Sequence, residues 1–397
     1  MDFQNVNPLN VKLNILSGNL LPMTSDNSSF PLVWKMYSIV IWLIELIQTS
    51  ATICGYVSVA NSDTLQDSGT VSFVVSIQVF ILLTRMYASR DLASQLIQKF
   101  NSFLRSEDES MKSIVNSTMK PLEIPLEFYS IGGTASVILW CCLPFFLIIK
   151  KKYFFYEDYA MIAAFSKQPF STNVFVLGNI MEGISSGYMF LKKVAIDIYM
   201  INIVMLMTAQ YRYVAVKLAT ILRNDASEEN ENCEFQKERS LLTEKKMKAL
   251  CRHYNTVILT MLTLKKFLSL NMSYIYLNNI VLFCFIDVLI VNIIVSRAYL
   301  QVPVIVMYLC GTLIQLYIMC FCIHQLLDAS KEVTDEAFHE KWYQFGPSLK
   351  YMFRMIMMAN NLNSKFSITE KFSLSLPSFL SILNQSYSIA LLLLKMK

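Results

Sequence analysis

The sequence predicts an all-α membrane protein with seven transmembrane helices, and three observations support this. Hydrophobic residues make up 54% of the 397 positions and charged residues only 16%, whereas a soluble domain carries about a quarter charged residues. The mean hydropathy is +0.44. All but one of the seven apolar segments have about 20 residues or more, which is enough to cross the hydrocarbon core as a helix. Basic residues gather in alternate connections, as in multi-pass membrane proteins.

The apolar segments are separated by polar connections. They cover approximately residues 32–60, 71–83, 128–149, 175–209, 272–295, 302–322 and 372–394. Residues 1–31 are polar and lack a secretory signal pattern, so we expect a cytoplasmic N-terminal tail. The fourth segment contains charged residues among its apolar ones. Its Lys193 and Asp197 stand four residues apart and can pair on one helix face.

The distribution of Lys and Arg predicts the orientation. With the N-terminus inside, 24 of these residues fall in the tail and connections on the cytoplasmic side and seven on the other side. Since basic loops favour the cytoplasm, we expect a cytoplasmic N-terminus and an extracellular C-terminus. The cluster Lys150–Lys152 runs against this trend.

The cytoplasmic connections show helical patterns of their own. Residues 241–266 mix apolar and charged positions at helical spacing and lead into the fifth crossing. In the cytoplasmic anchor region 326–371, charged residues alternate with apolar ones over 326–340, Gly346-Pro347 marks a break, and a short apolar helix follows over 349–358. These patterns predict helix extensions that pack into a cytoplasmic assembly domain. A single helical cap is the alternative.

The last segment, 372–397, has one polar side. Ser381, Asn384, Gln385 and Ser388 recur at spacings that place them on one stripe of a helix. Continuing the stripe by fours from Asn384 gives Ser388, Leu392 and Met396. A polar stripe ending in apolar side chains suits a water-filled pathway with an apolar constriction. The alternative is a helix–helix contact held by Ser and Asn side chains.

Nothing in the sequence indicates an enzyme, a cofactor, a metal site or a nucleic-acid partner. The nine cysteines are an odd number and lie mostly in apolar segments, and the three histidines are scattered. We find no phosphate loop and no nucleophile–base pattern. Glu45, Glu182, Asp197 and Asp287 lie in or near apolar segments, where ionisable groups are costly. For each, a structural hydrogen-bond partner is favoured over a proton relay.

The region 308–397 resembles the C-terminal signature of the insect odorant receptor family. The matching pieces are YLCGTLIQLYIMCFCIHQLL at 308–327, Trp342-Tyr343, Pro347 with LKYMFRMIMMAN, and FSLSLPSFLSILNQSYSIALLLL near the end. Weaker similarity extends back to AQYRYVAVKLATIL at 209–222, and the N-terminal third matches in topology and in its PLN start.

The resemblance implies one subunit of an odorant-gated, non-selective cation channel in the plasma membrane of sensory neurons. In that family a tuned subunit forms a heterotetramer with a shared co-receptor, and the last helix lines the pore. Carried over to this chain, the constriction falls on Leu392 and Met396. The co-receptor's long insertion between the fourth and fifth crossings is absent, which indicates a tuned subunit.

We expect a pocket for a small volatile ligand in the outer half of the helices. Apolar and aromatic side chains with a few hydroxyls suit a site that holds its ligand by shape and dispersion. The candidate residues are Phe73, Ile77, Phe80, Ser136, Trp140, Phe145, Tyr188 and Tyr308. Trp140 is the strongest candidate, because the family pattern places a pocket aromatic near this depth. The alternative is that these are ordinary core residues.

Three other functions compete with this one. A gustatory-type receptor channel shares the architecture. A receptor coupled to a G protein requires the opposite orientation. The sequence also lacks the Asp/Glu-Arg-Tyr triplet that such receptors carry after the third crossing. A transporter requires internal repeats, and only the charged fourth segment favours it.

Overall fold

The computed structural model of the chain describes residues 1–24, 30–59, 68–105, 108–226, 233–296, 302–339, 342, 346–364 and 374–395. These residues form helices, with one isolated β-bridge between Phe154 and Phe170 in the connection from η2 to α7. In chain order the elements are α1 (Phe3–Val6), α2 (Pro8–Leu16), α3 (Leu32–Val59), α4 (Ser68–Ala88), α5 (Arg90–Leu104), α6 (Glu109–Cys142), η2 (Leu143–Ile149), η3 (Tyr156–Asp158), α7 (Thr172–Ala226), α8 (Cys233–Ser296), α9 (Val302–His339), α10 (Pro347–Ser364) and α11 (Leu376–Lys395).

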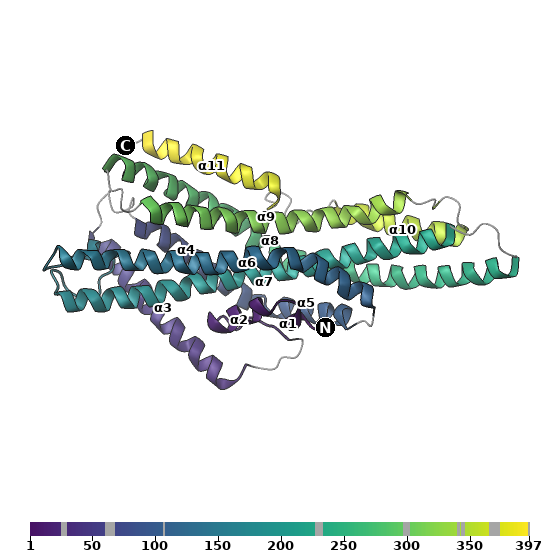
Figure 1. The fold of residues 1–397 in the computed structure, drawn as a ribbon, viewed down its shortest axis with the longest axis horizontal. Helices are drawn as coiled ribbons and strands as arrows, with labels where there is room; N and C mark the ends of the chain where they lie inside the picture. Colours follow the sequence, from purple (N-terminus) through teal and green to yellow (C-terminus); the bar gives the residue numbers. More distant parts are fainter. Residues whose placement is uncertain are drawn as a thin grey trace.

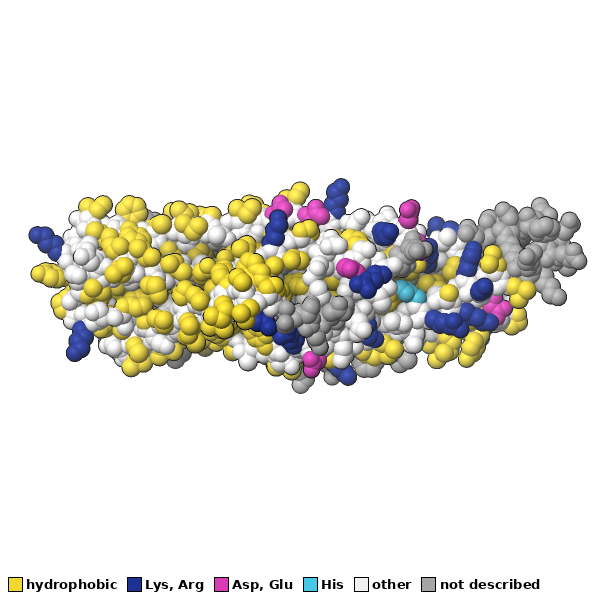
Figure 2. All heavy atoms as spheres, turned by 90° about the horizontal axis from the view of Figure 1, so that it is seen from below, with side chains coloured by type: hydrophobic (Ala, Val, Ile, Leu, Met, Phe, Trp, Pro, Cys, Tyr) yellow, Lys and Arg dark blue, Asp and Glu magenta, His cyan; other side chains and the backbone are white. Residues whose placement is uncertain are grey.

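The helices form an elongated bundle with an apolar half and a polar half. The C-terminus of α11 lies toward the end of the apolar half, and α10 lies in the polar half (Figure 1). Figure 2 shows hydrophobic side chains over the first half and Lys, Arg, Asp and Glu over the second. An apolar outer surface is expected where lipid is the solvent. The apolar half is therefore the part embedded in the membrane, and the polar half is the part exposed to water.

Six helices in the described part of the chain are long and apolar enough to cross a membrane. They are Leu32–Val59, Gly69–Ala88, Glu109–Ile149, Leu241–Val295, Val302–Asp335 and Leu376–Lys395. Each overlaps one of the apolar segments found in the sequence, and the fourth of these segments, 175–209, lies in α7 (Thr172–Ala226), which is not among the six. The prediction of an all-helical membrane protein is confirmed.

Helix α7 is the centre of the bundle. It is 55 residues long, or about 80 Å at 1.5 Å per residue, and it packs on α2, α3, α4, α6, α8 and α9. Every residue from 192 to 211 is buried. A helix enclosed on all sides needs no polar face, and here even the charged residues Lys192, Lys193 and Asp197 lie inside the protein.

The N-terminal residues, predicted as a tail, are folded onto the bundle. Phe3, Leu13 and Leu21 belong to the main hydrophobic core. The Asn14 side chain closes the turn after α2, because its amide donates to the Leu21 carbonyl at 3.0 Å and its oxygen accepts from the Leu21 N–H at 2.9 Å. The Phe3 N–H donates to Asn101 of α5 at 2.8 Å. Residues of the N-terminal segment are therefore part of the packed bundle, and its cytoplasmic location stays a prediction.

The polar half contains the predicted helix extensions. Helix α8 runs through the amphipathic stretch into the fifth apolar segment without a break. Helix α10 begins at Pro347, as the Gly-Pro break predicted, and packs on α8 and α9. The rings of Trp342 and Phe353 stack at 4.9 Å, and the Ser348 hydroxyl donates to Glu244 of α8 at 2.9 Å.

An ion pair joins the start of α6 to α7 in the polar half. Lys217 lies 2.7 Å from the Asp108 carboxylate, and the Tyr213 hydroxyl donates to the same group at 2.8 Å. The hydrogen bond from Lys217 lowers the pKa of Asp108 to about 2. The carboxylate therefore stays ionised at physiological pH.

Candidate functional site

An inner cavity lies in the apolar half, among α4, α6, α7, α8 and α9. Its volume, counted as space for the centre of a water-sized sphere, is about 90 Å³. At roughly 10–15 Å³ for each water-sized sphere, the cavity holds about six to nine of them, so it suits a small molecule. Its lining residues are Val71, Ser72, Val75, Ser76, Ser136, Val137, Trp140, Met161, Ser186, Met189, Phe190, Ile286, Leu289, Val304, Ile305 and Tyr308.

Three of the predicted pocket residues meet in this cavity. Ser136 and Trp140 stand one turn apart on α6, and Tyr308 faces them from α9. The Trp140 side chain is partly buried, so part of the indole surface is available to a ligand. Their role in binding stays a prediction, but the structure brings them together.

The predicted residues of α4 lie on another face of that helix. The ring of Phe73 contacts Tyr56 of α3 at a centroid distance of 5.9 Å, and Phe80 contacts Trp42 of α3 at 5.4 Å. Ile77 is 40% exposed. Sequence periodicity shows which residues share a face, but not which neighbour that face meets. The α4 residues on the cavity are therefore other ones.

Phe145 and Tyr188 also lie outside the inner cavity. Phe145 belongs to the 3₁₀ segment η2 and is absent from the lining of this cavity and of the outer cavity described below. The Tyr188 hydroxyl accepts from the Tyr37 hydroxyl of α3 at 3.4 Å. Tyr188 therefore packs α7 against α3.

The sequence analysis did not predict most of the residues that line the inner cavity. Ser72 and Ser76 of α4 stand four residues apart within an apolar helix, a spacing that was available as a signal for a polar spot on one face. Ile286 and Leu289 of α8 and Phe190 of α7 gave no such signal. Apolar side chains in apolar helices look alike until their packing is known.

The chemistry of the inner cavity is apolar with a few hydroxyls. No charged side chain is among the described residues that line it. The Ser76 hydroxyl donates to the Ser72 carbonyl at 3.0 Å, and the Ser136 hydroxyl donates to the Gly132 carbonyl at 2.9 Å. These serines are satisfied by their own helices. The cavity therefore suits a neutral, mainly apolar molecule held by shape and dispersion.

A second, outer cavity adjoins the first at the end of the apolar half. Its volume on the same measure is about 480 Å³. It is lined by Trp140, Leu143, Pro144, Phe146, Leu147, Ile149, Lys150, Glu157, Asp158, Tyr159, Ala160, Val304 and Ile305. Helix α6 ends at Cys142 and continues as η2, where Pro144 has no N–H to extend the α-helical pattern.

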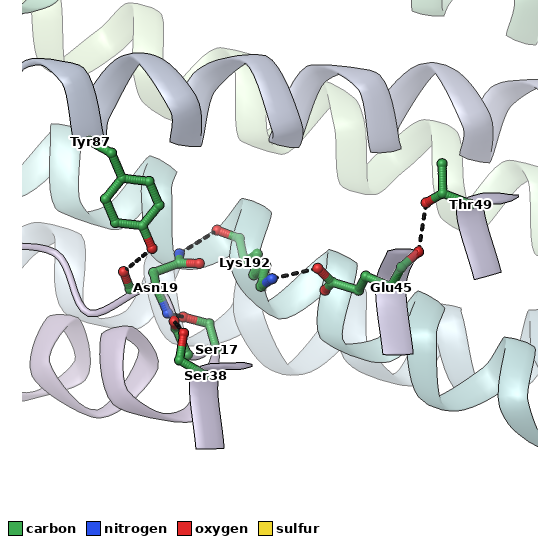
Figure 3. A network of polar contacts seen from close by, with 8 residues as sticks. Ser17, Asn19, Ser38, Glu45, Thr49, Tyr87 and Lys192 are labelled. Atoms are coloured by element: carbon green, nitrogen blue, oxygen red, sulfur yellow. Dashed lines mark hydrogen bonds and ion pairs between the residues drawn. The ribbon is translucent and has the colours of Figure 1, made fainter. Parts of the chain in front are cut away.

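A buried ion pair joins α7 to α3. The Lys192 ammonium contacts the Glu45 carboxylate, and both side chains have no exposed surface. The ammonium also lies 3.5 Å from the centre of the Trp42 ring. Figure 3 shows the pair within a larger polar network, in which the Asn19 amide donates to the Lys192 carbonyl at 3.2 Å and the Asn19 carbonyl accepts from Tyr87 at 2.5 Å.

Two other buried carboxylates, those of Asp197 and Glu182, also have hydrogen-bond partners within the chain. The Asp197 carboxylate accepts from Tyr129 of α6 at 3.0 Å and from Gln315 of α9 at 2.7 Å. Lys193 is close enough to attract it electrostatically. Glu182 accepts from the Met161 N–H at 2.5 Å. These partners support the interpretation of the buried charges as structural groups.

Helix α11 has a packed face and an open face. Ile382, Ser386 and Ala390 are buried, and the helix packs on α8 and α9. Asn384, Ser388 and Leu392 lie on the exposed side, Leu392 with 60% of its surface exposed. Asn384 and Ser388 border a shallow groove along the helix. Met396, the other predicted constriction residue, lies outside the described residues.

Comparison with known proteins decides the family. The sequence profile of the 7tm Odorant receptor family matches residues 67–387. The chain belongs to the odorant receptor family. It is therefore a multi-pass membrane receptor of a family that is not an enzyme family, and the resemblance found in the C-terminal region is confirmed.

Solved structures share the fold of this odorant receptor. The insect olfactory receptor OR5 from Machilis hrabei in complex with eugenol matches with a TM-score of 0.78 at 12% sequence identity, covering 99% of this chain and 98% of that one. The same receptor, described without eugenol, matches with the same score and identity, covering 98% and 97%. No curated protein sequence matches the chain.

Proposed function

We propose that this chain is a ligand-selective subunit of a heteromeric, odorant-gated, non-selective cation channel. It assembles with a shared co-receptor in the plasma membrane of sensory neurons, and binding of a small volatile molecule opens the channel and depolarises the cell. The observation that carries the proposal is the uncharged inner cavity within the helical bundle of an odorant receptor.

The ligand binds in the inner cavity, with Trp140 as its main contact. Indole offers a large apolar area and one hydrogen-bond donor, and Ser136 and Tyr308 face the same space. The solved relative was bound to eugenol, a small neutral molecule of the kind that this cavity suits. Phe73, Ile77, Phe80, Phe145 and Tyr188 take no part in our proposed site.

The ion path runs along the open face of α11. Asn384, Ser388 and Leu392 have no covering helix within the described chain, because the opposite face packs on α8 and α9. A polar stripe that no part of its own subunit covers suits a pore shared with neighbouring subunits. Met396, four residues after Leu392 in the sequence, lies outside the described residues, and its part in the constriction stays a prediction from spacing.

Recording ligand-evoked current tests the channel. The chain is expressed with and without the co-receptor, under a G-protein block, and a diverse odorant panel is applied. We expect current only with the co-receptor and unaffected by the block. Current that disappears under the block contradicts the channel mechanism and favours a coupled receptor.

Trp140→Ala tests the binding site. We expect it to abolish or retune the response while surface expression and co-assembly persist. Phe73→Ala is the matched control, because it also removes an aromatic ring but lies on the face of α4 that meets α3. Dose–response curves identical to the parent across the panel would show that the ligand binds elsewhere.

The N-terminus lies in the cytoplasm and the C-terminus outside. The excess of basic residues in the tail and the even-numbered connections supports this orientation. An epitope at Met1 should be hidden in intact cells and one after Lys397 accessible. Labelling of the N-terminal epitope without permeabilisation contradicts both the orientation and the channel proposal.

A further inference from the structure

The inner and outer cavities share one wall. Trp140 of α6 and Val304 and Ile305 of α9 line both of them. A side chain that borders two cavities is the partition between them, and the two volumes therefore lie in series. The outer one is about five times larger on the same measure, at about 480 Å³ against about 90 Å³.

Polarity changes from one cavity to the other. The inner cavity has no charged residue in its described lining, whereas Lys150, Glu157 and Asp158 border the outer one. Because exposed charged side chains are costly within the hydrocarbon, the exposed Lys150 and Glu157 indicate the level where the protein meets water. The outer cavity thus opens at the aqueous boundary, while its walls are the apolar residues of η2, including Leu143 and Leu147.

The far wall of the outer cavity is a folded unit. Phe154 and Phe170 exchange two backbone hydrogen bonds of 3.1 Å, and the rings of Phe154 and Phe175 stack at 4.0 Å. The Asp158 carboxylate accepts from Lys151 at 2.6 Å and from the Phe155 N–H at 2.8 Å. The connection between η2 and α7, which contributes Glu157, Asp158, Tyr159 and Ala160 to the lining, is therefore a packed segment.

We propose that the outer cavity is an entrance vestibule, in which a neutral, mainly apolar ligand binds from the aqueous side before it passes Trp140 and Ile305 into the inner cavity. This inference rests on the proposed function, since it takes the inner cavity as the ligand site. It adds the route: the ligand arrives from water and not sideways from the lipid. Movement of the Trp140 side chain is the step that connects the two cavities.

A bulky adduct at the vestibule mouth tests the route. Glu157→Cys places a thiol at an exposed position of the lining, where a membrane-impermeant maleimide is attached to the assembled channel. The probe is the neutral alcohol, ester, ketone or phenol that evokes the largest current from the parent. We expect current onset and decay after washout to slow by at least about fivefold, because an obstructed route slows entry and exit together. The half-maximal concentration should stay within about twofold.

Tyr153→Cys is the matched control. Tyr153 is 68% exposed on the same connection and is absent from the lining of both cavities. The same adduct there should leave onset and decay unchanged, and the parent treated with maleimide corrects for the native cysteines. Fluorescent labelling measures the occupancy of each introduced thiol.

Three results would overturn the vestibule. Unchanged rates in a fully labelled Glu157→Cys channel would show that the ligand enters elsewhere, including through the lipid. Failure of the impermeant reagent to label the thiol of that variant would show that the mouth does not face water. A shifted half-maximal concentration with unchanged rates would make the outer cavity an equilibrium site. Failure of the proposed function is distinct, since the parent then gives no current or Trp140→Ala leaves its responses unchanged.

Discussion

Helices α7 and α11 both carry polar side chains among apolar ones, but charged residues near the middle of α7 are buried, whereas polar residues on one face of α11 are exposed. Lys192 and Asp197 of α7 are buried and meet partners from α3, α6 and α9 within the same chain. Asn384 and Ser388 of α11 lie on a face that no other described helix covers. A polar side chain in an apolar helix can therefore either hold the fold together or remain open to another partner. Its contacts in the structure show which of the two applies.

The cost of leaving each group alone explains the difference. An ionised side chain at the membrane core requires a counter-charge from within the protein, because lipid offers none. Exposing a serine hydroxyl or an asparagine amide costs less free energy than exposing an ionised side chain. In a channel, such a group can form hydrogen bonds with water. The buried charges of α7 therefore hold helices of the same chain together, whereas the polar stripe of α11 is left uncovered by the other described helices.

The largest expected effect comes from breaking the Glu45–Lys192 pair. Lys192→Met leaves a buried carboxylate without its partner, so we expect a loss of about 3–5 kcal/mol in the free energy of unfolding. The measurement is thermal stability of the detergent-solubilised protein together with surface expression. The double variant Glu45→Met/Lys192→Met should recover much of the loss, because it removes both charges. A stable single variant would show that the pair is dispensable.

The packed face of α11 gives the next effect. Ser386 is 1% exposed, so Ser386→Leu overfills the contact with α8 and α9 and should cost about 1–3 kcal/mol. Ser388→Leu makes the same change two residues later on the exposed side, and we expect near-parental thermal stability. Equal losses for the two variants would contradict the assignment of the two faces.

The open face should affect conduction more than folding. We expect Leu392→Ser to raise the basal current or change ion selectivity while the ranking of ligands stays the same. Leu393→Ser is the control, because its side chain points about 100° further round the helix. Current–voltage curves in exchanged cation solutions provide the measurement. Parental conduction in the Leu392 variant would place the pore elsewhere, for instance on the co-receptor.

Asn384→Ala should have the smallest effect on stability. The Asn384 side chain is exposed, so we expect thermal stability within about 0.5 kcal/mol of the parent. Its contrast with Lys192→Met is the direct test of the comparison. A large loss of stability in the isolated subunit would mean that Asn384 has a packing partner in the chain.

Several features followed from the sequence alone. Composition and segment length determined an all-helical membrane protein, because a span of fixed thickness requires apolar helices of fixed length. The Gly346-Pro347 break located the start of α10, since proline ends one helix and begins another by its own geometry. The spacing of Asn384, Ser388 and Leu392 placed them on one stripe, because helical periodicity is a local property.

Other features depended on the tertiary structure. Glu45 and Lys192 lie 147 residues apart, and nothing local in the sequence pairs them. Phe73 and Val75 both belong to apolar α4, yet the rotation of the helix turns one toward α3 and the other into the inner cavity. Helical periodicity fixes which residues share a face, but the neighbour of that face is decided by packing of the whole bundle.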